Sequence, residues 1–190
     1  MKMRVITEEN MNTTEWSGGK TTEMLIYPQS STYAERNFRF RISSATVEEE
    51  SSIFTELPGI ERHLVVLDGE IDLKIEKQEF HLAPFESIVF QGGDKTSSKG
   101  KCVDFNLMLN GCRGNLEVFI IEETVHTSMN ANEMCMFYSY ESDLEVKKGK
   151  EVFDIPRKGL LIVESEGFGA ENIALCAKKG TRVIGVKIQV

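Results

Sequence analysis

Short stretches of alternating apolar and polar residues, separated by turn residues, run along the whole chain. In residues 71–75, three aliphatic residues alternate with Asp72 and Lys74, the pattern of a strand with one buried face. Only residues 129–133 suggest a single helical turn. The pattern therefore predicts an all-β chain. Further β-prone stretches occupy residues 23–27, 38–47, 63–67, 87–90, 103–109, 116–121, 136–140, 160–163, 173–177 and 182–190.

One group of these strands occurs twice. Residues 72–89 read strand, turn, strand, proline turn, strand, and residues 143–161 repeat the order with Pro156 in place of Pro84. A repeated β unit of this size predicts two stacked barrels or jelly rolls, because closing a sheet removes its unpaired edges. We assign residues 1–112 to an N-terminal barrel and residues 113–190 to a C-terminal barrel, packed as one compact unit.

The charge and the apolar content of the chain argue against nucleic-acid and membrane partners. The 190 residues carry a formal net charge of −8, which argues against a nucleic-acid surface. No apolar run approaches the ~20 residues that span a bilayer, and the N-terminus lacks the apolar segment of a signal peptide. We therefore expect a cytoplasmic protein with no membrane partner. The four cysteines are scattered without a C-x-x-C pair, so we expect free thiols.

Residues 16–23 invite comparison with a phosphate-binding loop, since Gly18 and Gly19 precede Lys20 and Thr21. That motif needs another glycine five positions before Gly19, where this chain has Thr14. It also needs a strand before the loop and a helix after it, and here a strand follows. The segment therefore predicts a turn that leads into a strand.

A metal site is not expected. The chain has three histidines, His63, His81 and His126, and no H-x-H pair. A metal in such a barrel would want two or three histidines and a carboxylate converging on one point. His63, at the start of a strand, is more simply a hydrogen-bonded structural residue. We expect no metal and no cofactor.

Polar groups recur on strands that must also build a core. Arg41 and Ser43 share one strand face, as do Asp104 and Asn106, and Arg62 follows a turn. Directed into a barrel, the arginines would offer planar forks for a carboxylate. Two alternatives stay open: Arg41 on a solvated outer face, and a purely structural pair between an arginine and the aspartate.

Five motifs, in order, resemble those of the HutD/Ves family of bacterial bicupins. They are Trp-x-Gly-Gly-x-Thr-x-Glu at 16–23, Phe-Arg-Ile-Ser-Ser-Ala at 40–45, and the segments 54–62, 67–70 and 104–108. The resemblance covers roughly the first 110 residues, and the rest follows only by the repeat. One departure is a glycine loop two residues shorter, with Lys20 in place of glycine.

The resemblance implies an all-β bicupin of two cupin-like barrels without the usual metal-binding histidines. It implies a protein associated with histidine utilisation, proposed as a sensor that binds a small carboxylate such as urocanate or formylglutamate. It leaves open whether the chain is a monomer or a homodimer. The pocket residues it implies are Trp16, Gly19, Thr21, Glu23, Arg41, Ser43, Arg62, Asp104 and Asn106.

The residues favour binding over catalysis. No serine or cysteine nucleophile can be paired with one of the three scattered histidines. The alternative is an isomerase or hydrolase of the broader cupin group, with Glu23 or His63 as the acid or base. A third alternative is a protein-interaction module that works through the acidic surface.

Overall fold

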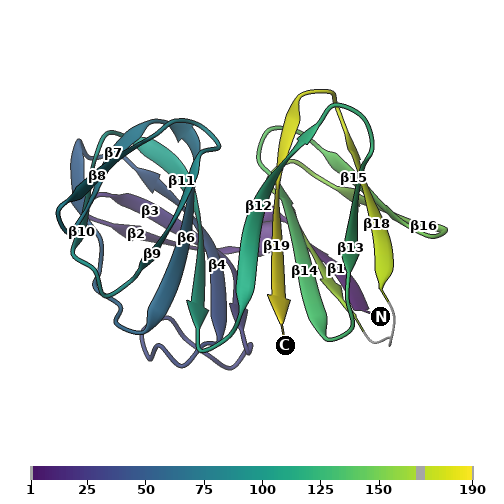
Figure 1. Cartoon of the computed structure of the whole chain (residues 1–190), viewed down its shortest axis with the longest axis horizontal. Helices are drawn as coiled ribbons and strands as arrows, with labels where there is room; N and C mark the ends of the chain where they lie inside the picture. The colour runs from purple at the N-terminus through teal and green to yellow at the C-terminus, as the bar shows by residue number, and fades with distance from the viewer. Residues whose placement is uncertain (1, 166–169, 190) are drawn as a thin grey trace. The chain divides into compact units, whose positions relative to one another are not determined.

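The computed structural model describes residues 2–165 and 170–189. Figure 1 shows that strands dominate the described chain; a short 3₁₀ helix, η1 (Glu8–Asn10), joins the first two strands. The predicted all-β class is confirmed. The helical turn expected at residues 129–133 is wrong, because these residues end β13 (Val125–Met129), form a turn and begin β14 (Glu133–Ser139).

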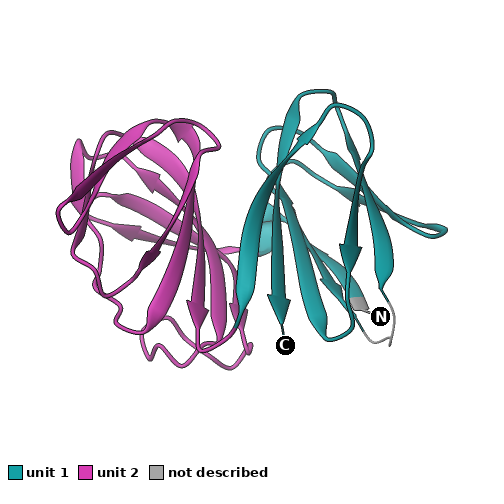
Figure 2. Ribbon diagram, viewed as in Figure 1, with its two compact units in different colours: residues 1–10, 113–190 teal, residues 11–112 magenta. Residues whose placement is uncertain are grey.

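The chain divides into two compact units, drawn in different colours in Figure 2. We call residues 11–112, drawn in magenta and labelled unit 2 in Figure 2, the first unit; they contain a six-stranded sheet in the order β2-β3-β4-β11-β6-β9 and a four-stranded sheet in the order β5-β10-β7-β8. Their bounds are β2 (Asn12–Trp16), β3 (Gly19–Tyr27), β4 (Phe40–Val47), β5 (Ser51–Ile53), β6 (Ile60–Gly69), β7 (Ile71–Ile75), β8 (Gln78–Leu82), β9 (Ser87–Gln91), β10 (Thr96–Lys99) and β11 (Cys102–Asn110).

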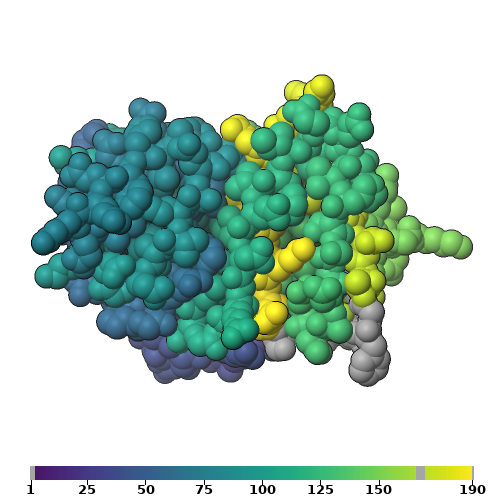
Figure 3. All heavy atoms as spheres, in the orientation of Figure 1, coloured from purple at the N-terminus to yellow at the C-terminus, as the bar shows by residue number. Residues whose placement is uncertain are grey.

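The second unit, drawn in teal and labelled unit 1 in Figure 2, consists of residues 1–10 and 113–190. It contains a five-stranded sheet in the order β1-β17-β14-β19-β12 and a four-stranded sheet in the order β13-β18-β15-β16. The turn between β15 and β16 projects from the rest of this unit (Figures 1 and 3). The remaining bounds are β1 (Lys2–Ile6), β12 (Gly114–Ile121), β15 (Leu144–Lys148), β16 (Glu151–Ile155), β17 (Leu160–Glu164), β18 (Glu171–Ala177) and β19 (Thr181–Gln189).

The two units share one topology. Strands β4 to β11 pair in the same order as β12 to β19: β4-β11-β6-β9 corresponds to β12-β19-β14-β17, and β5-β10-β7-β8 corresponds to β13-β18-β15-β16. The sequence repeat at residues 72–89 and 143–161 covers β7 to β9 and β15 to β17 of this scheme. Added strands distinguish the units, since β2 and β3 extend the sheet beside β4 and β1 extends the sheet beside β17.

The position of β1 differs from the expected division at residue 112. That division placed residues 1–10 with the first barrel, whereas β1 pairs antiparallel with β17, from Lys2 opposite Glu164 to Ile6 opposite Leu160. The edge of β17 offers unpaired backbone groups, and β1 satisfies them.

Apolar side chains fill the space between the sheets of each unit. In the second unit the core joins Phe137 of β14 to Val146 of β15 and Leu175 of β18, all fully buried. In the first unit, Leu64 of β6 packs with Leu73 of β7. No helix in the described residues is long and apolar enough to cross a membrane. The four cysteines are free thiols, as expected.

Candidate functional site

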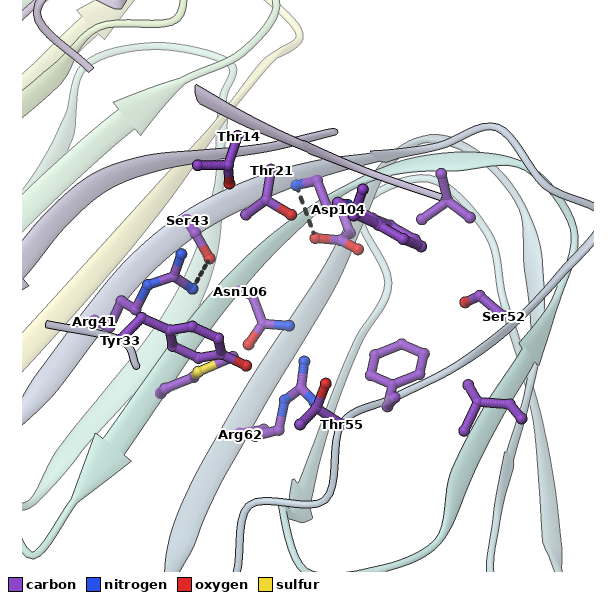
Figure 4. Close-up of a pocket in the computed structure, with 16 residues that line it drawn as sticks. Thr14, Thr21, Tyr33, Arg41, Ser43, Ser52, Thr55, Arg62, Asp104 and Asn106 are labelled. Atoms are coloured by element: carbon purple, nitrogen blue, oxygen red, sulfur yellow. Dashed lines mark hydrogen bonds between the residues drawn. The ribbon is translucent and has the colours of Figure 1, made fainter. Parts of the chain in front are cut away.

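A cavity of about 380 Å³ opens into the first unit, with lining residues from both of its sheets and from the loops between them. This volume lies in the range of small-molecule sites. Figure 4 shows polar side chains of neighbouring strands directed into this space. Two predicted residues, Gly19 and Glu23, lie outside its lining. Seven of the residues expected from the sequence line it, namely Trp16, Thr21, Arg41, Ser43, Arg62, Asp104 and Asn106.

Strand register brings these groups together. Strands β4 and β11 are adjacent and antiparallel, with Ser43 opposite Asn106 and Ala45 opposite Asp104. Because alternate residues of a strand share a face, Arg41 and Ser43 point to the same side as Asp104 and Asn106. Of the two orientations left open for Arg41, the structure has the inward one, with 6% of the residue exposed.

Arg41 has two hydrogen-bond partners in the protein. Its Nε donates a hydrogen bond to Glu23 Oε2 at 2.6 Å, and its Nη1 donates to Ser43 Oγ at 2.9 Å. The guanidinium carbon lies 4.5 Å from the centre of the Tyr33 ring. Glu23 therefore supports the site from β3 by neutralising and orienting Arg41.

Arg62 is the opposite case. The residue is 6% exposed, and its Nε has no hydrogen-bond partner. Among the residues that the structure describes, its guanidinium forms no hydrogen bond or ion pair. It lies instead against two aromatic rings that contact each other, 4.8 Å from the centre of Phe54 and 5.3 Å from that of Phe90. Burial lowers the pKa of Arg62, and the nearby charge of Asp104 opposes that shift.

Asp104 and Asn106 add unsatisfied acceptors beside this arginine. Asp104 is 5% exposed, and its Oδ1 accepts one hydrogen bond from the Ala45 N–H at 3.2 Å (Figure 4). Burial raises the pKa of Asp104 to about 6, although the Ala45 hydrogen bond and the charge of Arg62 act in the other direction. Asn106 is also buried, and its Oδ1 has no partner in the described chain.

The tryptophan–glycine segment forms one side of the cavity mouth. Residues 16–19 are the turn of the β2–β3 hairpin, with Trp16 paired to Gly19, so no helix follows the glycines and the rejection of a phosphate loop agrees with the structure. A Cβ atom on Gly18 would lie 2.1 Å from the Trp16 ring. The missing side chain therefore lets the indole, in a residue that is 41% exposed, fold over the turn.

Gly19 supports the pairing of the backbone and does not line the cavity. It pairs with Val47, and a Cβ at this position would lie 1.9 Å from the carbonyl oxygen of Thr46. We expect Gly19→Ala to lower the free energy of unfolding by about 2 to 4 kcal/mol, because the β3–β4 pair must open to admit the methyl group. Gly59→Ala is the control: its φ of 81° is also positive, but open space surrounds it, so about 1 kcal/mol is expected. Urea unfolding measures both, and equal losses would contradict the steric argument.

Three residues that line the cavity were not predicted from the sequence. Tyr33, Ile53 and Phe54 line the cavity, and they come from loops and the short strand β5. Ile53 is 88% exposed, an unusual position for an isoleucine, at the cavity mouth. Phe54 lies in a motif that was quoted for the family resemblance, but nothing in its pattern showed that it contacts Arg62.

In the second unit, the positions of Arg62, Asp104 and Asn106 hold no charged or amide side chain. Aligning the two units by strand pairing places Cys135 at the position of Arg62, Val183 at that of Asp104 and Gly185 at that of Asn106. Cys135 and Val183 are fully buried in the apolar core. Phe119, at the position of Ala45, occupies the space above Gly185, where a Cβ would lie 2.4 Å from its ring. The second unit has a cavity of about 440 Å³ of its own, lined by Glu117, Phe119, His126, Thr127, Ser128 and Asn172, but the positions that carry the buried polar group of the first unit are apolar or glycine there.

No group of three or more histidine, cysteine or acidic side chains in the described residues could hold a metal ion. His63 Nε2 lies 2.8 Å from Glu61 Oε1, the structural hydrogen bond expected for it. The exposed His81 bonds to Asp72 at 2.9 Å, and this bond raises its pKa.

Comparison with known proteins gives the family and the fold. The HutD family model matches residues 8–183, and no curated protein matches the chain. Among solved structures, the protein of unknown function PA5104 from Pseudomonas aeruginosa PAO1 is 20% identical to this chain, with a TM-score of 0.88. HutD from Pseudomonas fluorescens SBW25, in a formate condition, is 22% identical, with a TM-score of 0.79. Both comparisons cover 100% of each chain. Vicilin from Solanum melongena, described as holding different anionic ligands in structurally similar pockets, is 10% identical, with a TM-score of 0.64 over 98% of this chain and 84% of its own.

At these identities the structural neighbours show the fold alone, and they confirm the expected bicupin of two jelly-roll-like units. The family model is the stronger evidence, since it extends through both units and beyond the first 110 residues that carry the motifs. The chain belongs to the HutD family.

Proposed function

We propose that this HutD-family chain binds a small carboxylate in the cavity of its first unit, with the charge of Arg62 as the anchor. The observation that carries the proposal is the state of Arg62 itself: a guanidinium that is buried, directed into a cavity and without any hydrogen bond or ion pair in the described chain. A buried charge of this kind is unfavourable unless something pairs with it. A carboxylate of the ligand supplies that pair.

The two arginines have different roles in this proposal. Arg41 is already neutralised by Glu23, so it contributes shape and hydrogen-bond direction rather than a free charge. Arg62 has planar donors and no partner in the described chain, and a carboxylate can accept two parallel N–H bonds from such a group. Thr21, Ser43 and Asn106 line the same cavity and orient the ligand, while Trp16 covers it at the mouth.

Membership of the HutD family suggests the ligand class. We propose a sensor or regulatory role in histidine utilisation, with urocanate or formylglutamate as the carboxylate. The formate condition of the Pseudomonas fluorescens HutD structure and the anionic ligands of the vicilin pockets are properties of those proteins. They support the choice of anions as the first compounds to test here.

The catalytic alternative with Glu23 or His63 as the acid or base has no support from the site. Glu23 is engaged by Arg41 and His63 by Glu61, and neither lines the cavity. An acid or base must be able to reach the bound ligand. Binding is therefore the function that the geometry supports best.

A thermal-shift screen tests the proposal. Formate, acetate, urocanate and formylglutamate are compared with neutral amides such as formamide, and we expect at least one carboxylate, but no amide, to raise the melting temperature. Arg62→Met should weaken the binding of that carboxylate by at least about 100-fold, because the charge that pairs with it is removed.

Arg39→Met is the matched control. Arg39 lies in the same unit directly before β4, but its side chain is exposed and outside the cavity lining. Its substitution should leave the ligand-induced shift unchanged. No stabilisation by any carboxylate, or equal stabilisation of the Arg62→Met variant, would refute carboxylate binding at this site.

A further inference from the structure

We propose that Asp104 is a ligand-binding residue of this cavity, and that it takes up a proton when a carboxylate binds at Arg62 and then donates a hydrogen bond to the bound anion. This inference rests on the proposed function, because it concerns the same site. It adds a second requirement to binding, namely a proton delivered to a buried carboxyl group.

The first step is the geometry of Asp104. Its side chain lines the cavity beside Arg62, and in the described residues only the Ala45 N–H bonds to it, through Oδ1. The second oxygen, Oδ2, has no partner among these residues. No Arg62 nitrogen lies within ion-pair distance of either oxygen among the described contacts. A ligand oxygen between the two side chains can therefore meet the guanidinium on one side and Asp104 Oδ2 on the other.

The second step is charge. With Arg41 neutralised by Glu23, the open part of the cavity holds one positive group, Arg62, and one acidic group, Asp104. If Asp104 stayed ionised, a bound carboxylate would place two negative groups side by side in a buried space, and like charges in such a site cannot both ionise at low cost. A proton on Oδ2 removes the repulsion and creates an O–H donor for the anion.

The third step is the availability of the proton. Burial already raises the pKa of Asp104 to about 6, so the free carboxyl group is close to protonation at neutral pH. A second anion beside it raises the pKa further. The proton comes from the solvent, and no other group has to lose one.

The surroundings of Asp104 offer few competing groups. Strands β2 and β5 contribute Thr14, Trp16, Ser52 and Ile53 to the cavity, none of them charged. Burial and the charge of Asp104 raise the pKa of Cys102, on the same strand, to about 12. The titratable or charged side chains that line the cavity from other elements are Arg62 of β6, Arg41 of β4 and Tyr33 of the loop before β4, while Glu23 of β3 lies outside the lining and pairs with Arg41.

Formate is the probe for the test, since it is the smallest carboxylate and stays ionised from pH 6 to pH 8. Binding is followed by the fluorescence of Trp16, the only tryptophan of the chain, which lines the cavity mouth. We expect the dissociation constant to rise roughly 50-fold from pH 6 to pH 8, because the protonated fraction of Asp104 falls by that factor. Calorimetry in buffers of different ionisation enthalpy should show uptake approaching one proton per formate at pH 8.

Asp104→Asn separates this inference from the proposed function. The amide keeps the shape of the protonated acid and a donor, but it cannot titrate. We expect formate to bind this variant with nearly the same dissociation constant at pH 6 and pH 8, and more tightly than the parent at pH 8.

Each other outcome has a defined meaning. Formate binding to the parent with no pH dependence and no proton uptake overturns the role of Asp104 but leaves carboxylate binding intact. Loss of binding in Asp104→Asn at every pH also overturns it, since Asp104 would then act as an ionised acceptor. If neither formate nor the larger carboxylates of the screen bind the parent at any pH, the proposed function itself fails.

Discussion

Replacing Arg62 by methionine is expected to make the ligand-free protein more stable, by about 1 to 2 kcal/mol, while it removes carboxylate binding. A buried charged group without hydrogen bonds costs several kcal/mol, and the two aromatic contacts of Arg62 return only part of that. Methionine has a similar length, has no group to leave unpaired, and packs well against rings such as those of Phe54 and Phe90.

Arg41→Met provides the contrast within the same cavity. Arg41 holds Glu23 and Ser43, so its removal leaves a carboxylate that is 24% exposed without its partner. We expect a loss of about 2 kcal/mol in the free energy of unfolding. The two arginines are similarly buried, but in the described chain only Arg41 has hydrogen-bond and ion-pair partners.

Urea unfolding followed by circular dichroism measures both variants. Loss of the Arg62 charge also affects Asp104, so the comparison is repeated in the Asp104→Asn background, which removes that coupling. This is better than working in acid, because the net charge of the protein falls towards zero near its sequence pI of about 5.1, and a net charge near zero favours association. If Arg62→Met destabilises the protein as much as Arg41→Met does, Arg62 is a structural residue and not an anchor held ready for a ligand.

The strand pattern predicts the fold well, for a physical reason. Period-two alternation of the kind seen at residues 71–75 depends only on which face of a strand is buried, and the structure has β7 there with alternately buried and exposed residues. The duplicated order is visible because both units must build the same pairings. The place of β1 could not be foreseen, since an edge strand is chosen by a partner more than 150 residues away in the sequence.

The site is predictable only in part. Arg41, Ser43, Asp104 and Asn106 stand out because polar groups at alternate positions of core strands are costly to bury unless they line a cavity or bond to one another. Whether each arginine has a partner is not visible in the sequence, since Glu23 reaches Arg41 through the pairing of β3 with β4. The role of Ala45 is not visible in the sequence either, because it depends on strand pairing. Its small side chain leaves open the space that Phe119 fills in the second unit.

Arg62 and Asp104 together lower the stability of the ligand-free fold at the cavity. Each is buried with fewer hydrogen bonds than its charge requires. Residues held in this way persist at functional sites, where the unfavourable state is relieved by the ligand. The second unit shows the alternative, with Cys135 and Val183 packed in the core at the same positions.

Asp104→Asn is expected to stabilise the protein at pH 8 by up to about 3 kcal/mol, which for a chain of this size corresponds to roughly 6 to 12 °C in melting temperature. The sign follows from linkage. Asp104 has a pKa of about 6 in the folded chain against an ordinary value of 3.8, so the folded state holds this proton more tightly. The contribution of this proton to the free energy of unfolding is fully present below about pH 4, falls as the pH rises towards 6, and is lost above that.

The asparagine variant has no such proton to lose, so its advantage over the parent should be constant above pH 7 and shrink below pH 6. Melting curves at intervals from pH 5.5 to pH 8.5 measure this difference. Glu79→Gln is the matched control, because this carboxylate of β8 has a side chain that is 77% exposed, and its substitution should change stability by less than about 0.5 kcal/mol at every pH. A variant at position 104 that is less stable than the parent at pH 8 would mean that ionised Asp104 supports the fold, and that its charge, not its proton, is what the cavity requires.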